Sequence, residues 1–164
     1  MKKAYLFVLT LSVSIIFAAC SGGSGGPLNP KAFNDKAISI FEGATKTLDA
    51  FDAKITQGVK SNDLASIGEA AQLALTDIDA KIEAMKALNI PEGADAYKES
   101  VLKSLQSLKS IVETGKKYSE LKEGYSKKEF NALEKEYNNK RKQLSADLKS
   151  VSKAASAFMK SSVK

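Results

Sequence analysis

Apolar residues return every three or four positions along most of the chain after residue 30, which is the spacing of one face of an amphipathic helix. The pattern is interrupted at short stretches that contain Gly, Pro, Ser, Asn or Asp, the residue types that favour turns. It therefore predicts four helices joined by short turns, over residues 30–59, 62–89, 94–122 and 127–161.

Two of these helices have recognisable starting residues. Asn29 is a good N-cap, and Pro30 suits the first helical position because its missing N–H would have no partner there. Ser61 or Asn62 is expected to cap the second helix, with the negative charge of Asp63 close to the positive end of its dipole.

The start of the last helix carries the strongest local signal. Ser126 and Glu129 have the spacing of a capping box, in which each side chain accepts a hydrogen bond from the other residue's backbone N–H. Tyr125 and Phe130 stand at the two positions of a hydrophobic staple. A helix is therefore expected to begin directly after Ser126.

Four long helices with short connections predict an all-α fold, an antiparallel up-down-up-down four-helix bundle over residues 30–164. Composition agrees, since Ala, Lys, Leu, Ser and Glu are abundant and Pro occurs only at 27, 30 and 91. Single glycines at 43, 58, 68 and 115 are expected to mark close helix contacts or helix ends.

One core position of the last helix falls on a cation. Between Tyr137 and Leu144 the apolar spacing reaches Lys140 or Arg141. The long side chain would extend past the core edge and keep its charge in water. Alternatively, Arg141 would point inward and pair with Glu42 or Asp49 of the first helix, which would fix the helix register.

A row of hydroxyl groups accompanies the apolar stripe of the third helix. Its members are Ser100, Ser104, Ser107 and Thr114. Such a row is either a flank of small side chains that lets a neighbouring helix approach closely, which is the interpretation we favour, or the lining of a polar groove for a ligand.

Charge is shared unevenly among the predicted helices. Lys and Arg minus Asp and Glu give +1 over residues 30–60, −3 over 61–90, 0 over 91–124 and +6 over 125–164. Because the second and fourth helices of an up-down bundle lie at opposite corners, one edge is expected to be acidic and the other basic. The basic edge comprises Lys127, Lys128, Lys140, Lys142, Lys149, Lys153 and Lys160. It is either a solubilising face or a surface for anionic headgroups or an anionic polymer.

The composition argues against most enzyme chemistry. The chain has no His, which excludes a Ser-His-Asp triad, a Glu-x-x-His di-iron motif and a His-ligated haem. The densest acidic group, Asp77, Asp79 and Glu83, lacks the spacing of an EF-hand. We therefore expect no catalytic residues, no metal and no cofactor, so the chain is not expected to be an enzyme.

The first 26 residues follow a different pattern. Lys2 and Lys3 precede an apolar run over residues 4–17, then Ala18, Ala19 and Cys20, and then only Ser and Gly to residue 26. A basic start, an apolar run and small residues before a cleavage point are typical of an export signal. The Ser/Gly stretch is typical of a flexible linker.

Residues 1–20 resemble the signal peptide of bacterial lipoproteins, with Ala18, Ala19 and Cys20 at the family's −2, −1 and +1 positions and Phe17 where Leu is usual. The resemblance implies a signal peptide at 1–19, lipidation at Cys20, a tether at 20–29, and a bacterial cell envelope location, with the outer membrane the expected one. The remainder is similar to small Lys- and Ala-rich helical envelope lipoproteins, partly through residues 90–97 at the turn into the third helix. That likeness transfers no site residues.

Two functions remain open at this point. The first is a membrane-anchored, non-enzymatic helical module that binds an envelope protein or an anionic envelope polymer, and not nucleic acid. The second is a small-molecule binder or a hydrolase with a polar pocket between helices, beside Ser104 and Ser107.

Overall fold

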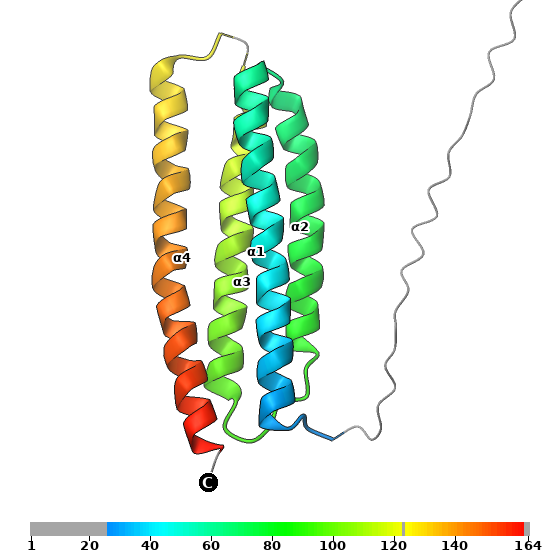
Figure 1. Ribbon diagram of the computed structural model, residues 1–164. Helices are drawn as coiled ribbons and strands as arrows, with labels where there is room; N and C mark the ends of the chain where they lie inside the picture. Colours follow the sequence, from blue (N-terminus) through cyan, green and yellow to red (C-terminus); the bar gives the residue numbers. More distant parts are fainter. Residues whose placement is uncertain (1–25, 123, 163–164) are drawn as a thin grey trace, which may run out of the picture.

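A computed structural model describes residues 26–122 and 124–162. Its elements are α1 (Pro30–Ser61), α2 (Leu64–Lys86), α3 (Asp95–Lys116), a 3-10 helix η1 (Lys117–Glu120) and α4 (Lys127–Ser161). The described part contains no strand and forms an antiparallel up-down-up-down four-helix bundle, as the sequence predicts (Figure 1).

Consecutive helices pack on one another, but the four are not equivalent. α1, α2 and α3 are in mutual contact, whereas α4 packs chiefly on α3 and touches α1 only lightly. α2 and α4 lie on opposite sides of the bundle (Figure 1). The acidic second helix and the basic fourth helix are therefore separated, as expected.

The core is built from the apolar faces of the helices. Its most deeply buried large side chains are Phe33, Leu48, Phe51, Ile67, Ile78, Met85, Val101, Leu105, Leu108, Ile111 and Val112. All of them belong to α1, α2 and α3, so the centre of the described core is a three-helix arrangement. In the sequence, the buried residues of this core extend from Phe33 in α1 to Phe158 in α4.

Gly115 explains how closely α3 approaches α1. A Cβ placed there would lie 2.5 Å from Cε1 of Phe51 and 2.9 Å from Cδ1 of Ile55. These distances are shorter than carbon atoms tolerate, so only glycine allows this packing. The expectation that a single glycine marks a close helix contact is confirmed at this position.

The ends of α1 and α2 differ from the expectation at one point. Asn29 caps α1 and accepts a hydrogen bond from Ala32 N at 2.8 Å, as predicted. Asn62 does not cap α2; it adopts a left-handed conformation with φ 55° and closes α1. Asp63 is the N-cap of α2, and its carboxylate accepts from Ser66 N at 3.3 Å. The connection is so short that one residue ends a helix and the next begins another.

The third helix is shorter than its apolar stripe suggests. The α-helical part ends at Lys116, before the expected position 122, and continues as η1 to Glu120, so Tyr118 is buried from a 3-10 turn. The second helix likewise ends at Lys86, three residues before the expected position 89.

The predicted start of α4 is confirmed in detail. Ser126 Oγ accepts from Glu129 N at 3.2 Å, and the Glu129 carboxylate accepts from Ser126 N at 2.7 Å. The rings of Tyr125 and Phe130 stack with centroids 5.9 Å apart, which completes the hydrophobic staple.

Aromatic rings hold α4 near both of its ends. At one end Phe158 packs edge-on against Phe33 of α1, with ring centroids 5.7 Å apart. At the other end Tyr118 packs against Phe130 and Tyr137, at 5.6 Å and 6.2 Å. The C-terminal end of α4 thus lies beside the N-terminal end of α1.

Candidate functional site

The residue on which the lipoprotein resemblance depends, Cys20, lies outside the described residues, as do the signal sequence and most of the tether. The described chain begins at Gly26, and Leu28 N–H donates a hydrogen bond to the carbonyl of Asn89 at 3.1 Å. Within residues 26–122 and 124–162 no helix has the length and apolarity needed to cross a membrane.

The hydroxyl row on α3 is engaged in internal contacts. Ser104 is completely buried and donates to the carbonyl of Ser100 at 3.1 Å, while Thr114 donates to the carbonyl of Ser110 at 2.9 Å. Ser107 donates to Asp147 of α4 at 2.7 Å. These contacts fit the interpretation that the row is a flank for close helix packing.

Asp147 is the polar centre of the contact between α3 and α4. Its side chain is only 2% exposed, and it accepts from Ser107 and Gln143 and pairs with Lys103 at 2.9 Å. Burial disfavours the charged carboxylate, but the hydrogen bonds from Ser107, Lys103 and Gln143 outweigh burial and lower the pKa of Asp147. A buried, ionised carboxylate therefore fixes where α4 sits on α3.

Arg141 pairs with the first helix, but not with the carboxylates proposed for it. Its partner is Asp52, which also accepts a hydrogen bond from Tyr137. The Arg141 side chain is 41% exposed, so the inward, buried pair with Glu42 or Asp49 is wrong. Burial and the neighbouring Asp52 carboxylate raise the pKa of the Tyr137 hydroxyl, which therefore remains a neutral donor.

Each acidic side chain of the group Asp77, Asp79 and Glu83 on α2 forms an ion pair with a different lysine. Asp77 pairs with Lys81, Asp79 pairs with Lys109 of α3 at 2.7 Å, and Glu83 pairs with Lys86 at 2.8 Å. In the part of the chain that the structure describes, no group of three acidic, His or Cys side chains is placed to hold a metal ion.

The outer face of α4 carries a single file of cations that we call the lysine row: Lys135, Lys142, Lys149, Lys153 and Lys160. Spacings of seven, seven, four and seven residues bring these side chains within roughly 40° of one another around a helix of 3.6 residues per turn. All five are exposed, and they lie opposite the buried positions Leu133, Leu144 and Phe158.

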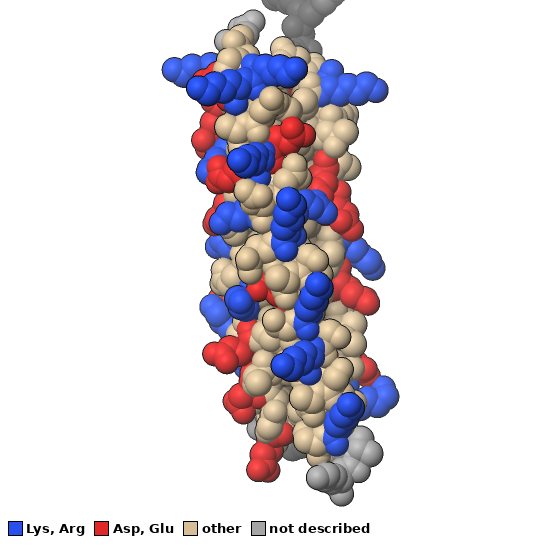
Figure 2. All heavy atoms as spheres, turned by 90° about the vertical axis from the view of Figure 1, so that its left-hand side faces the viewer, with Lys and Arg blue, Asp and Glu red and all other residues tan. Residues whose placement is uncertain are grey.

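Few acids lie near the lysine row in the described part of the chain. Among the described residues, none of its members forms an ion pair. From Tyr137 to Ser161 the only acidic residue is Asp147, whose side chain is buried on the other side of the helix. Figure 2 faces this side of the bundle and shows blue side chains down its middle, with much of the red toward its edges.

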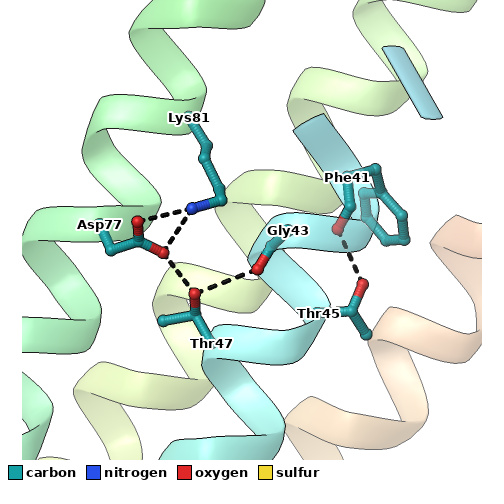
Figure 3. A network of polar contacts seen from close by, with 6 residues as sticks. All are labelled: Phe41, Gly43, Thr45, Thr47, Asp77 and Lys81. Carbon is teal, nitrogen blue, oxygen red and sulfur yellow. Dashed lines mark hydrogen bonds and ion pairs between the residues drawn. The ribbon is translucent and has the colours of Figure 1, made fainter. Parts of the chain in front are cut away.

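A groove between α1 and α2 is a second candidate, which the sequence did not indicate. It has a volume of about 510 Å³, and Lys46, Thr47, Lys54, Asp77 and Lys81 are its polar lining residues. At one end Lys81 contacts both carboxylate oxygens of Asp77, and Thr47 of α1 contacts the same carboxylate (Figure 3). The four-residue spacing of Asp77 and Lys81 is visible in the sequence, but the contact from α1 is not.

Comparison with models of protein families, with curated proteins and with solved structures finds no match for this chain. The fold and its surfaces define the class: a four-helix bundle whose last helix presents an unpaired cationic face. Within that class, the features that distinguish this molecule are the lysine row on α4 and the groove between α1 and α2.

Proposed function

We propose that this chain is a lipid-anchored module of a bacterial envelope that binds an acidic polysaccharide along the outer face of α4 and catalyses no reaction. The observation that carries the binding proposal is the lysine row, five exposed lysines in single file that form no ion pair among the described residues. The location rests on the lipoprotein-like sequence of residues 1–20, with Cys20 as the lipidated residue and the outer membrane as the expected site.

The length and width of the lysine row fit a linear polyanion. From Lys135 to Lys160 the helix rises about 38 Å, at 1.5 Å per residue. The row is one side chain wide, which suits an extended chain of charges better than a flat surface. The acidic α2 lies on the other side of the bundle from the row. The positive potentials of the five lysines therefore add along α4 with little cancellation from α2.

The residues beside the row favour a sugar polymer among polyanions. Short amide and hydroxyl side chains flank it on the exposed surface: Asn138, Asn139, Ser145, Ser152 and Ser156. Such groups both donate and accept hydrogen bonds, which is what sugar hydroxyls require. Acidic sugar groups would pair with the lysines while neighbouring hydroxyls contact these flanks.

The alternative, a binder or hydrolase beside Ser104 and Ser107, has no specific observation in its favour. Ser104 is completely buried within α3, and Ser107 is bonded to Asp147. Neither hydroxyl is presented to a substrate by the contacts that the structure describes.

The test compares two variants with the same loss of charge, made in residues 26–164, whose folding is first checked by circular dichroism. The first variant changes Lys142, Lys149, Lys153 and Lys160 to Gln; the control changes the exposed Lys36, Lys54, Lys60 and Lys122, which lie outside α4, to Gln. Binding of fluorescently labelled polygalacturonate is measured by anisotropy. We expect a loss of affinity of about tenfold or more in the first variant and about twofold or less in the control, because local charge density attracts a polyanion.

Binding is also expected to weaken steeply with added salt. At 0.1 M ionic strength the attraction between exposed charges is largely screened beyond a Debye length of about 10 Å. Equal effects of the two variants would contradict the proposal, because then only net charge matters. Binding to phosphatidylglycerol vesicles through the row, with none to polygalacturonate, would replace the polysaccharide by a membrane surface.

A further inference from the structure

From the groove between α1 and α2 we infer a binding site for a single-chain anionic amphiphile, of which a free fatty acid is the occupant we commit to. This site is separate from the lysine row: it lies on the first two helices, and none of its lining residues belongs to α4. The inference rests on the shape of the groove, its apolar lining and the placement of its cations.

Small side chains create the groove. Ala50 of α1 and Ala70 and Ala74 of α2 leave room between the helices where larger side chains would fill it. The ring of the buried Phe51 contributes to the apolar lining, and Leu73 adds a wall although its side chain is 74% exposed. A leucine left that exposed beside an apolar hollow loses the stabilisation that covering it would provide.

The dimensions suit one alkyl chain. The lining residues of α1 run from Lys46 to Lys54, which corresponds to about 12 Å along the helix. A volume of about 510 Å³ lies within the range of sites that hold small molecules, which are predominantly apolar with a few placed polar groups. A volume of this size holds a single alkyl chain but is too small for a second protein helix, whose diameter with side chains is about 10–12 Å.

The cations of the groove are not equivalent. The Lys81 ammonium is held by both oxygens of Asp77, at 2.6 Å and 2.5 Å, and lies over Gly43, where a Cβ would be 2.7 Å from its Cε (Figure 3). Hydrogen bonds from Lys81 and Thr47 outweigh the burial of Asp77 and lower its pKa, so this pair stays charged.

Lys46 and Lys54 remain available for a ligand. Both are exposed, and among the described residues neither forms an ion pair. The groove therefore has two uncompensated positive charges, one near each end, beside an apolar floor. A fatty acid matches this arrangement: its carboxylate meets one lysine, while its chain covers the alanines and Leu73 and lies against the methylene stem of the other lysine.

The test uses residues 26–164 and cis-parinaric acid, a fatty acid whose fluorescence rises in apolar surroundings, displaced by laurate below the concentration at which laurate forms micelles. One variant combines Lys46→Gln with Lys54→Gln. A second, Ala50→Phe, fills the groove from its exposed side and leaves the core untouched. The control combines Lys36→Gln with Lys60→Gln, which removes the same charge from α1 outside the groove.

We expect the double variant in the groove to weaken laurate binding about tenfold or more, with about twofold or less in the control, since it removes the cation that pairs with the carboxylate at whichever end the carboxylate lies. Methyl laurate, which has the same chain and no charge, should bind weakly to all lysine variants alike. Ala50→Phe should weaken both ligands.

Three results would overturn the inference. The first is the absence of saturable laurate binding. The second is laurate binding that Ala50→Phe does not weaken, because the ligand would then lie elsewhere. The third is binding of an acidic amphipathic peptide in the groove without any binding of laurate, which would make the groove a protein docking site.

Discussion

α2 and α4 differ in how much of their surface they bury against the rest of the bundle. α2 has 23 residues and buries six of them, with Ile67, Ile78 and Met85 almost completely enclosed. α4 has 35 residues, yet its buried apolar side chains are only Leu133, Tyr137, Leu144 and Phe158, which are 3–8% exposed. The longer helix therefore has the weaker apolar attachment.

α4 lies along α3, but its most specific contacts are found at a few positions. Aromatic rings hold its two ends, and Asp147 joins its middle to α3 by ionic hydrogen bonds. Between these points most of its surface is exposed, which leaves one whole side for the lysine row. α1, α2 and α3 therefore supply the most deeply buried part of the core, whereas α4 covers one side of α3 and supplies a surface.

The largest expected effect on stability comes from a Leu→Ala substitution in the inner core, compared with the same substitution in α4. Leu48→Ala, at a position 1% exposed, should lower the free energy of unfolding by about 2–5 kcal/mol, because it leaves a cavity among three helices. Leu144→Ala should cost about 2 kcal/mol, the lower end of the range for this substitution, since this leucine lies at the margin of the core and its site can relax. Urea unfolding measures both.

Leu73→Ala is the control for that comparison, because the Leu73 side chain is largely exposed and should contribute little in the absence of a ligand. Equal losses at positions 48 and 144 would contradict the division between an inner three-helix core and a peripheral α4.

An intermediate effect concerns the polar attachment. Because the folded state lowers the pKa of Asp147, its stabilisation is complete above the unfolded value of about 3.9 and is lost as pH falls through the folded pKa. At pH 7, Asp147→Asn should cost about 1–3 kcal/mol, typical of hydrogen bonds to a charged group. The difference between wild type and variant should shrink as the pH is lowered below about 4.

Urea unfolding at the two pH values measures this difference, and hydrogen exchange should show that α4 amides lose protection before those of α2. Asp49→Asn, at an exposed carboxylate without an ion pair among the described residues, provides the matched control. A difference that stays constant with pH would show that the charge of Asp147 does not hold α4.

The smallest effect is expected at the contact between α4 and α1. Arg141→Met removes the pair with Asp52, but both side chains are partly exposed, at 41% and 27%. Solvent-exposed pairs contribute about 0–1 kcal/mol, so the melting temperature should change by a few degrees at most. Thermal unfolding measures it, with Lys142→Met on the outer face as the control. A large loss of stability, or several folded states in NMR spectra, would restore the idea that Arg141 fixes the helix register.

The sequence predicts this fold well because its local signals agree with one another. The apolar stripes repeat every three or four residues, and the cap at Asn29 and the capping box at Ser126 each act within one turn, so all are visible in short stretches of sequence. The error at Asn62 has a physical reason: Asn and Asp are both good caps, and Asn also tolerates the left-handed conformation that ends a helix. Sequence spacing alone does not decide between those roles.

The candidate sites depend on contacts between helices, and there the sequence is less informative. The lysines of α4 are visible in it, but their lack of acidic neighbours depends on how the helices pack. Thr47 and Asp77 are 30 residues apart and meet only because α1 and α2 run antiparallel in this particular register. The partner of Arg141 was missed for the same reason, since Asp49 and Asp52 lie within one turn of each other.

The start of α1 and the end of α4 lie side by side, and this has a mechanical consequence. Tension applied through the residues before Pro30 first meets the hydrogen bond from Leu28 to Asn89 and then the rings of Phe33, Tyr97 and Phe158. These three rings come from α1, α3 and α4, so they distribute the force over three helices at the point where it enters. Contacts among these three rings are therefore the packing that such a force must break first at this end of the bundle.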